Sequence, residues 1–305
     1  MGCLFGACLA RSHHDVVMVD QRTDRAELIA SRGILVTGMS GDFTAKVEAT
    51  TDTAKTADAD LIIICVKSYD TATAIARLPR ELSSNSAVLT LQNGLGNAEL
   101  IAERFGAEHA YAGTTALGAT LLAPGHVRHS GAGVTILGRF RGSPDENVAR
   151  IVTALNDAGL EARTTTDVNV TLWNKVIVNA AINPLTALTG VRNGQLIDLP
   201  EARALLALVV RECEMVARSG DVTGNTLTRV EEVCERTALN VSSMLQDIIR
   251  GKPTEIRSIN AAVAGKAERQ GIVAPVNLVL TELVGVLEKR NPFWREDRKR
   301  EYGLD

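Results

Sequence analysis

Several features that mark special classes of protein are missing from this chain of 305 residues. The formal net charge is only −3, so no surplus of basic residues points to nucleic acid as a partner. The longest apolar runs, Leu61–Val66 and Ala204–Val210, fall far short of the roughly 18 residues that a membrane helix needs. The N-terminus has no charged segment followed by an apolar core, which indicates that it is not a signal peptide.

The cysteines and histidines give no sign of a disulfide framework or of a metal centre. The five cysteines are scattered, odd in number and never spaced as Cys-x-x-Cys. This usage favours unpaired thiols in a reducing cytoplasm. His126 and His129 lie close together, but no cysteine or carboxylate lies near them in sequence to complete a coordination shell. We therefore expect no metal.

The first half of the chain alternates strand and helix patterns. The runs Val16–Asp20, Leu61–Lys67 and Ala87–Gly94 are rich in β-branched and apolar residues, and a helical pattern capped at Thr23 or Asp24 ends at Gly33. Leu61–Lys67 is continuously apolar, as expected of a strand buried on both faces. The order predicts an α/β doubly wound sheet, and the Gly-rich segment 110–139 predicts an antiparallel extension of it.

The second half is predicted to be all-helical. From Asn169 onward, apolar residues recur at helical spacing, and the predicted helices stop at Gly220, Gly251 and Gly271. Pro253 and Pro275 stand where first-turn prolines are expected. We predict a dinucleotide-binding, Rossmann-like domain over residues 1–166, a helical domain over 167–290 and a charged tail over 291–305. With 45% hydrophobic residues, the chain can form two cores.

The opening "MGCLFGACLARSHHDVVMVD" resembles the end of a phosphate-binding turn, followed by a small-residue helix and a strand that ends in an acid. In a G-x-G-x-x-G motif the third glycine lets the helix pack on the sheet, and Gly2 stands in that place. Asp20, 18 positions later, suits an adenosine ribose, whereas the neighbouring Arg22 suits a 2′-phosphate. A short helix start and a plain strand-end carboxylate are the alternative interpretation.

If the nucleotide interpretation holds, the central first strand and the two leading glycines are absent from the sequence as given. Two explanations stay open: a start placed too late, or loss of the element. Removing a central parallel strand leaves its two neighbours with unpaired backbone groups, each costing about 1–3 kcal/mol if buried.

The stretch "LWNKVIVNAAINPLTALTG" carries the most information in the second half. Lys175, Asn179 and Asn183 fall at i, i+4 and i+8, so they form one polar stripe on a helix that is otherwise apolar. A buried lysine loses hydration and its pKa can fall, which suits a proton donor. A snorkelling lysine beside two core asparagines is the alternative.

Further polar residues follow apolar segments at positions where a ligand site is expected. Lys67 and Asn93 come after predicted parallel strands, at the carboxyl edge of the sheet where α/β proteins bind ligands. In "LNVSSMLQDIIRGKPTEIRSIN", polar side chains stand beside an apolar helix: Asn240, Ser242, Ser243 and Glu255. Ordinary turns, helix caps and an acid in a first helical turn explain each of them equally well in isolation.

Taken together and in this order, "CVKSYD", "LQNGLGN", "LWNKVIVNAAINPLTALTG" and "NVSSMLQDIIRGKPTEI" resemble the ketopantoate reductase family over nearly the whole chain. The resemblance implies an N-terminal Rossmann domain, a helical C-terminal domain and a substrate cleft between them. It also implies reduction of 2-dehydropantoate to (R)-pantoate with NADP(H), on the route to coenzyme A. Because Asp20 and Arg22 give conflicting signals, NAD(H) stays open.

The resemblance also implies a role for each matching residue. Lys175 is the expected proton donor. The residues expected to bind substrate are Asn93, Asn179, Asn183, Asn193, Asn240, Ser243 and Glu255. Those expected to contact the cofactor are Gly2, Asp20, Arg22, Lys67, Asn93, Ala119 and Glu255.

Two other functions fit the same sequence. One is the reduction of a different 2-keto acid by the same fold, and the other is a non-catalytic nucleotide-binding homologue. The expected partner is a small 2-keto acid, with neither nucleic acid nor membrane, and a homodimer is compatible with the sequence.

Overall fold

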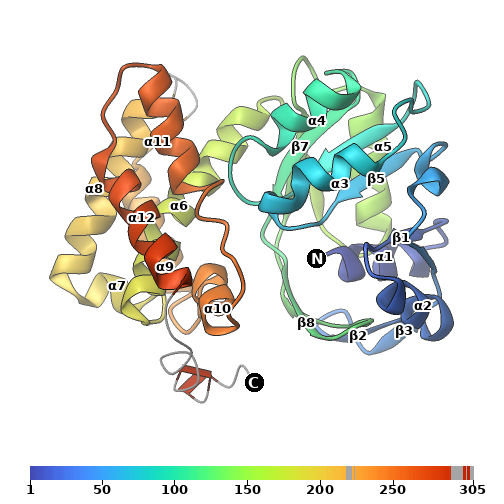
Figure 1. Ribbon diagram of the computed structural model, residues 1–305, viewed down its shortest axis with the longest axis horizontal. Coiled ribbons are helices and arrows are strands. Elements are labelled where there is room, and N and C mark those ends of the chain that lie inside the picture. The colour runs from blue at the N-terminus through green and yellow to red at the C-terminus, as the bar shows by residue number, and fades with distance from the viewer. Residues whose placement is uncertain (218–221, 223, 290–297, 300, 303–305) are drawn as a thin grey trace. The chain divides into compact units, whose positions relative to one another are not determined.

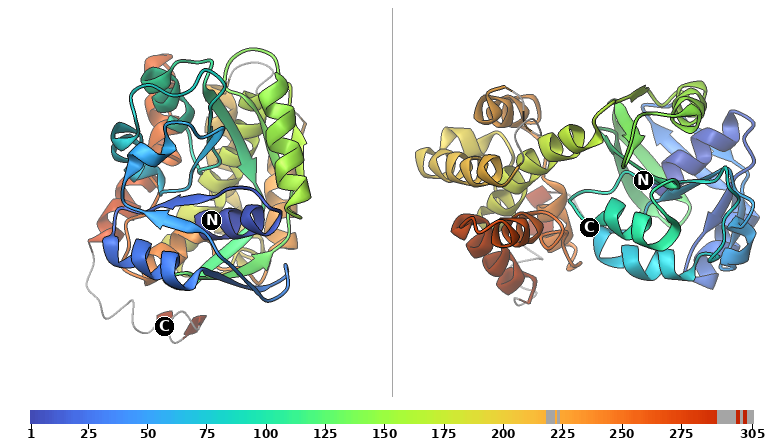
Figure 2. Two further views of the ribbon diagram at one scale, coloured as in Figure 1. Left: turned by 90° about the vertical axis from the view of Figure 1, so that its right-hand side faces the viewer. Right: turned by 90° about the horizontal axis from the view of Figure 1, so that it is seen from above.

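The computed structural model describes residues 1–217, 222, 224–289, 298, 299, 301 and 302. It divides into two compact units: Met1–Gln92 with Asn97–Thr171, and Asn93–Gly96 with Leu172–Asp305. The short loop 93–96 thus belongs with the second unit, although the chain on either side of it belongs to the first. The first unit is α/β and the second is helical (Figures 1 and 2).

The main sheet of the first unit has five strands in the order β11-β10-β7-β6-β5. Its strands are β5 (Leu61–Ile64), β6 (Ala87–Thr90), β7 (Ala110–Thr115), β10 (Thr135–Arg139) and β11 (Ala162–Thr164). The first three are parallel, whereas β10 runs antiparallel to β7. Its connecting helices are α3 (Thr71–Arg77), α4 (Asn97–Phe105) and α5 (Glu146–Asp157). The predicted α/β region with parallel strands is confirmed.

Two smaller sheets complete the first unit. One pairs β1 (Val17–Val19) with β4 (Glu48–Thr50) in parallel. The other has the order β3-β2-β9-β8. Its strands are β2 (Ile34–Gly38), β3 (Phe43–Ala45), β8 (Gly118–Ala123) and β9 (His126–Gly131). Part of the Gly-rich segment predicted to extend the main sheet therefore forms an antiparallel pair, β8 and β9, in a separate sheet.

In the described part of the chain, β5 pairs only with β6, and β1 pairs only with β4. Helix α1 (Gly2–Arg11) packs against both of these elements. A Cβ at Gly2 would lie 3.2 Å from Cβ of Cys65, and one at Gly6 would lie 2.4 Å from Sδ of Met18. The smallness of these two glycines lets the helix approach closely, while β1 and β5 each keep one edge without a strand partner.

The position of β5 corrects one detail of the sequence prediction. Leu61–Lys67 was expected to be buried on both faces, but only Ile62 and Ile64 are buried in the strand, whereas Leu61 and Ile63 are half-buried. An edge strand has no neighbour on one side, so its side chains are covered less completely. The next strand, β6, has a partner on each side and is buried at all four positions.

The second unit is built from helices packed around α6 (Val168–Thr189). The others are α7 (Gln195–Asp198), α8 (Pro200–Val216), α9 (Thr226–Arg236), α10 (Ser243–Ile249), α11 (Asn260–Arg269) and α12 (Pro275–Glu288). Val176, Ile177, Ala180 and Ala181 of α6 are at most 1% exposed, so the predicted burial of this helix is confirmed. No described helix is both long and apolar enough to cross a membrane.

Two of the predicted helices are shorter than the sequence pattern indicated. The pattern from Thr226 to Gly251 is divided into α9 and α10, because Ser242 caps a new helix by accepting a hydrogen bond from the backbone N–H of Leu245. Similarly, α11 begins at Asn260, so Pro253 is not a first-turn proline and Glu255 lies before the helix. Pro275 does stand in the first turn of α12, as predicted.

The predicted charged tail, 291–305, lies mostly outside the described residues. Of its described part, the guanidinium of Arg298 donates to the carbonyl oxygen of Gly190 at 3.3 Å. The hydroxyl of Tyr302 donates to the same oxygen. Gly190 follows the last residue of α6, so these two contacts satisfy a carbonyl at the end of that helix.

Candidate active site

Helix α6 presents the predicted polar stripe. It begins where the carboxylate of Asp167 accepts hydrogen bonds from the backbone N–H groups of residues 169 and 170, at 3.0 and 3.1 Å. Lys175 and Asn179 are half-buried, and Asn183 is 6% exposed. The stripe is therefore partly covered by protein, and most completely at Asn183. Burying a polar group costs free energy unless the group meets a partner or a ligand.

The surroundings of Lys175 lower the pKa of its ammonium group. Burial disfavours the charged form and lowers the pKa of Lys175 to about 8, while the nearby charge of Glu255 opposes this shift. Glu255 is itself only 6% exposed. A lysine with this pKa is mostly protonated at neutral pH but releases its proton far more readily than an exposed lysine, as a proton donor requires.

Asn93 contacts the same carboxylate. Its amide Nδ2 donates to Oε2 of Glu255 at 3.0 Å. The loop that carries Asn93 is fixed by its neighbours, since the backbone N–H of Leu95 donates to the carbonyl oxygen of Ser258 at 2.8 Å. Lys175, Glu255 and Asn93 thus come together from three distant segments of the chain within the second unit.

Only glycine fits the loop at position 94. Its φ is +91°, and an added Cβ would lie 2.3 Å from the carbonyl oxygen of Ser258. We expect Gly94→Ala to displace Asn93 from Glu255 and to lower turnover about tenfold or more, because small misplacements at a catalytic site are costly. Steady-state kinetics on Gly94→Ala would test this, with Gly96→Ala as the matched control. Gly96 has a similar φ of +96° but open space at its Cβ position, so backbone strain without a clash should leave a smaller effect.

The remaining predicted substrate residues lie on neighbouring loops of the second unit. Asn193 is 8% exposed, its Nδ2 donates to Oγ1 of Thr237 at 2.9 Å, and its Oδ1 is buried without a hydrogen-bond partner among the described residues. The backbone carbonyl of Asn240 accepts from the N–H of Asn193, but the residue itself is exposed. Ser243 is also exposed, whereas its neighbour Ser242 is buried.

The buried serine, Ser242, connects this loop to α6 through a hydrogen bond. Oγ of Ser242 is hydrogen-bonded to Oγ1 of Thr186 at 2.7 Å, one turn of helix beyond Asn183. The start of α10, where Ser243 stands, is thereby held beside the C-terminal half of the polar stripe. The sequence indicated polar groups here but not which of the two serines is buried.

In the first unit, Asp20 and Arg22 lie together at the end of β1. The carboxylate of Asp20 accepts from the backbone N–H of Arg22 at 2.8 Å and from the guanidinium of Arg25 at 2.7 Å. The side chain of Arg22 instead pairs with Asp24, and that pair is more than half exposed. Arg25, which the sequence pattern did not single out, is thus the residue whose guanidinium pairs with Asp20.

The other predicted cofactor residues are also in the first unit. Gly2 opens α1, whose N-terminus carries backbone N–H groups of the kind that bind a pyrophosphate. Lys67 follows β5 and is half-buried, and Ala119 is half-buried in β8. The carboxyl end of β5 is joined to that of β6, because Nε2 of Gln92 donates to the carbonyl oxygen of Val66 at 2.6 Å.

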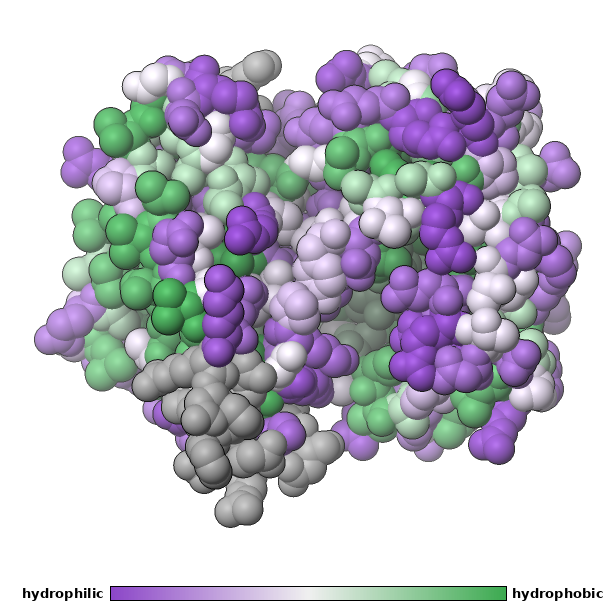
Figure 3. Space-filling view, viewed as in Figure 1, coloured by the Kyte–Doolittle hydropathy of each residue, from purple (hydrophilic) through white to green (hydrophobic). Residues whose placement is uncertain are grey.

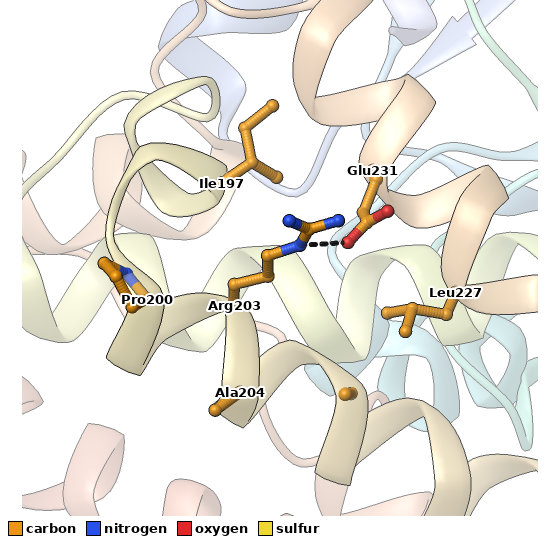
Figure 4. Close-up of a pocket in the computed structure, with 7 residues that line it drawn as sticks. Ile197, Pro200, Arg203, Ala204, Leu227 and Glu231 are labelled. Carbon is orange, nitrogen blue, oxygen red and sulfur yellow. Dashed lines mark hydrogen bonds and ion pairs between the residues drawn. The ribbon is translucent and has the colours of Figure 1, made fainter.

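A separate hollow of about 450 Å³ opens on α7, α8 and α9. Figure 4 shows Arg203 and Glu231 across its mouth, joined by an ion pair of 2.6 Å. Its other lining residues are Ile197, Pro200, Ala204, Ala207 and Leu227. It shares no residue with the predicted site, so we do not place the chemistry there.

An α/β unit with an acid and two arginines after its first strand, and a helical unit with a half-buried lysine of lowered pKa, are features found in dinucleotide-dependent oxidoreductases. Comparison with known families gives the particular one. Residues 1–142 match the model of ketopantoate reductase PanE/ApbA, and residues 167–288 match its C-terminal model. The chain belongs to this family.

Individual relatives agree with the family. The chain is 38% identical to a 2-dehydropantoate 2-reductase of Halobacterium salinarum, over 95% of this chain and 96% of that one. It is 35% identical to one of Archaeoglobus fulgidus, over 94% and 95%. Among solved structures, it resembles a PanE/ApbA family ketopantoate reductase from Ralstonia eutropha with a TM-score of 0.86, 31% identity and coverage of 94% and 95%. It also resembles a D-mandelate dehydrogenase with NADH and anilino(oxo)acetate, with a TM-score of 0.86, 26% identity and coverage of 93% and 94%.

Proposed function

We propose that this protein reduces 2-dehydropantoate to (R)-pantoate with NADPH, a step towards pantothenate and coenzyme A. The observation that carries the proposal is Lys175: a half-buried lysine with a pKa of about 8, near the charge of Glu255, on a helix whose polar stripe holds two amides. The names of the relatives support this substrate, because several that match over most of the chain are 2-dehydropantoate 2-reductases.

In the proposed reaction the nicotinamide, when bound, supplies the hydride that is added to the ketone carbon. As negative charge develops on the ketone oxygen, Nζ of Lys175 donates a proton to it and leaves a hydroxyl group. Glu255 keeps Lys175 charged before the reaction, since its carboxylate favours the ammonium form. The neutral lysine then regains a proton from solvent, so the enzyme returns to its starting state.

Uncharged side chains suit the remaining polar parts of the substrate, because they do not neutralise the ammonium group of Lys175. We assign Asn179 and Asn183, together with Ser243 and Asn240, to the carboxylate and hydroxyl groups of the keto acid. Asn193 offers a buried Oδ1 without a partner among the described residues, and a substrate hydroxyl can donate to it.

The first unit is proposed to bind the dinucleotide as a Rossmann-type fold. Gly2, Lys67 and Ala119 contact the cofactor in this proposal, and Asn93 and Glu255 contact both cofactor and substrate. The family implies a nicotinamide cofactor, and we assign NADPH because the guanidinium of Arg25 pairs with Asp20 and that of Arg22 pairs with the nearby Asp24, which brings two guanidinium groups to the end of β1. NADH is the alternative, since a carboxylate in this position can accept from ribose hydroxyls.

The decisive experiment measures oxidation of NADPH by the purified chain with 2-dehydropantoate, benzoylformate and branched 2-keto acids. Clear preference for 2-dehydropantoate supports the proposal. Preference for another keto acid would make that compound the substrate of this enzyme. If no keto acid is reduced with either nucleotide, although nucleotide binds in a fluorescence titration, the non-catalytic interpretation replaces the enzyme.

Nucleotide preference can be tested on α2 (Thr23–Arg32), where Arg22 immediately precedes the helix. We expect Arg22→Ala to raise KM for NADPH by about 10–100-fold, the value of a hydrogen bond to a charged group, and to change KM for NADH little. Arg32→Ala, in the last turn of the same helix, is the matched control and should affect neither. Equal losses for both nucleotides would contradict the assignment.

We also propose that the chain pairs with a second copy through an apolar face of α8 and α12. Leu278, Val279, Leu283 and Val286 of α12 are 47–66% exposed, and α8 adds Leu208 at 46%. Figure 3 shows apolar side chains gathered over these helices. A monomer rarely exposes a large apolar patch, and such a patch suits an identical surface on a second copy.

Leu283→Glu should convert the dimer to a monomer, because two carboxylates would be buried at an isologous contact. Light scattering after size exclusion would measure the mass. Leu121→Glu is the control, since Leu121 is 52% exposed but lies in β8 of the first unit. A monomeric wild-type chain at micromolar concentration would contradict the proposal.

The unpaired state of all five cysteines in the structure supports the further proposal that the protein works in the cytoplasm.

A further inference from the structure

Helix α6 contains a proline at position 184, and this leaves one backbone group of the helix without its usual partner. In an uninterrupted helix, the N–H of residue 184 would donate to the carbonyl oxygen of Ala180. Proline has no N–H, so this carbonyl has lost its helical donor. Ala180 is 0% exposed, so water does not replace the missing hydrogen bond.

Asn260 supplies the missing donor from another helix. Its Nδ2 donates to the carbonyl oxygen of Ala180 at 3.0 Å and to Oδ1 of Asn277 at 3.0 Å. An amide NH₂ has two hydrogens, so both are used. Turning the amide over would place its oxygen against two acceptors, so these contacts set its orientation.

The second contact of Asn260 leads to a fixed support. Nδ2 of Asn277 donates to Oε2 of Glu212 at 2.8 Å. The same carboxylate accepts from the backbone N–H groups of Val276 and Asn277, at 2.8 and 2.9 Å, in the first turn of α12. Asn260 and Asn277 are 0% exposed and Glu212 is 6% exposed. Oδ1 of Asn260 is buried without a partner among the described residues, but both hydrogens of its Nδ2, Oδ1 of Asn277 and the carboxylate of Glu212 are hydrogen-bonded. These contacts make the network rigid, because each one lost would leave a further buried polar group unsatisfied.

The position of this link relates it to the chemistry. Ala180 lies five residues after Lys175 on α6, and Asn260 lies five residues after Glu255 at the start of α11. The hydrogen bond between Asn260 and Ala180 therefore joins the two segments that carry the ammonium and the carboxylate. It acts on backbone, so it limits both rotation of α6 about its axis and movement of the segment that bears Glu255.

We propose that Asn260 is a positioning residue, which fixes Lys175 and Glu255 relative to each other by holding the carbonyl that Pro184 leaves unpaired. The inference rests on the proposed role of Lys175 as proton donor. Asn260 acts through the two helices and contacts no reacting atom in this proposal. The proline and the asparagine act together: Pro184 leaves the carbonyl of Ala180 without its helical donor, and Asn260 donates a hydrogen bond to it.

The first test replaces Asn260 by alanine and follows Lys175 directly. We expect Asn260→Ala to lower kcat about tenfold or more, since small displacements of a proton donor are costly. We also expect the alkaline limb of the pH profile of kcat to move to higher pH. The titration of Lys175, measured by NMR of ¹⁵N-labelled lysine side chains, should move in the same direction. Loosening the two segments admits water, and water weakens the burial that is the larger influence on this group.

The second test uses the dependence on proline. In Pro184→Ala the N–H of residue 184 can donate to Ala180, so the carbonyl no longer needs Asn260. We expect Asn260→Ala to cost much less in kcat, and to move the Lys175 titration less, in the Pro184→Ala background than in the wild-type background. A double-mutant cycle measures this coupling. It also covers the case in which Asn260→Ala alone fails to fold, because the double variant retains a donor for Ala180.

Gln270→Ala is the matched control. Gln270 lies just beyond the other end of α11, and its Nε2 donates to the carbonyl oxygen of Val216 at 3.0 Å, so it fastens α11 to α8 and not to α6. It should lower the melting temperature without moving the Lys175 titration. An unmoved titration in Asn260→Ala, or equal effects of Asn260→Ala in both backgrounds, would overturn the inference. Because the NMR titration needs no turnover, it decides this question even if 2-dehydropantoate proves not to be the substrate.

Discussion

Replacement of Lys175 by alanine is expected to lower kcat by about 10²–10⁴-fold, the usual contribution of a positioned general acid. The reason is that no other described group in this part of the second unit combines a proton with a pKa near 8. In the wild type, kcat should fall as pH rises through about 8, because the ammonium is the active form and deprotonation removes the donor. The alanine variant should lose this limb of the pH profile.

Stability separates a chemical role of Lys175 from a structural one. Its pKa is lower in the folded chain than the ordinary value of a lysine, so at pH below 8 the folded state holds this proton less favourably than the unfolded chain does. Removing the ammonium should therefore leave the melting temperature unchanged or raise it. Lys252→Ala, an exposed lysine of the same unit, is the control and should change neither quantity. Wild-type turnover in Lys175→Ala would remove Lys175 from the mechanism.

Replacement of Glu255 by glutamine is expected to have the second-largest effect, about 10–100-fold at pH 8, because each unit of pKa corresponds to a tenfold change in protonation. The carboxylate raises the pKa of Lys175 against the effect of burial, so its neutralisation lets that pKa fall. The alkaline limb of the kcat profile should move to lower pH. Activity should recover in part at acidic pH, where Lys175 is protonated again.

The glutamine variant keeps the shape of the site, because its side-chain oxygen can still accept from Nδ2 of Asn93. Glu288→Gln is the matched control. Glu288 holds Thr254, the neighbour of Glu255, through hydrogen bonds of 2.6 and 2.8 Å, and so neutralises a carboxylate beside the same segment. A loss of activity in Glu255→Gln that is the same at every pH would show that Glu255 acts on the substrate and not on Lys175.

Local patterns of the sequence determined the two halves and the identity of the polar stripe. Strands and helices are mixed up to residue 164, and from residue 168 onward the described elements are helices, because period and β-branching act over a few neighbouring residues. The order Lys175, Asn179, Asn183 follows from helix geometry alone. Local pattern did not separate α9 from α10 or delay α11 to Asn260, since those ends depend on contacts with distant loops.

Only the tertiary structure decided which polar groups meet. The sequence contains Asn93 and Glu255 as unrelated residues 162 positions apart, and it takes the folded chain to bring them to 3.0 Å. The same holds for Ser242 with Thr186 and for Asn260 with the carbonyl that Pro184 leaves free. Helical and strand periods arise from the backbone and are therefore local. Electrostatic surroundings, and with them the pKa of Lys175, depend on which segments pack together and exclude water, and no local pattern determines that.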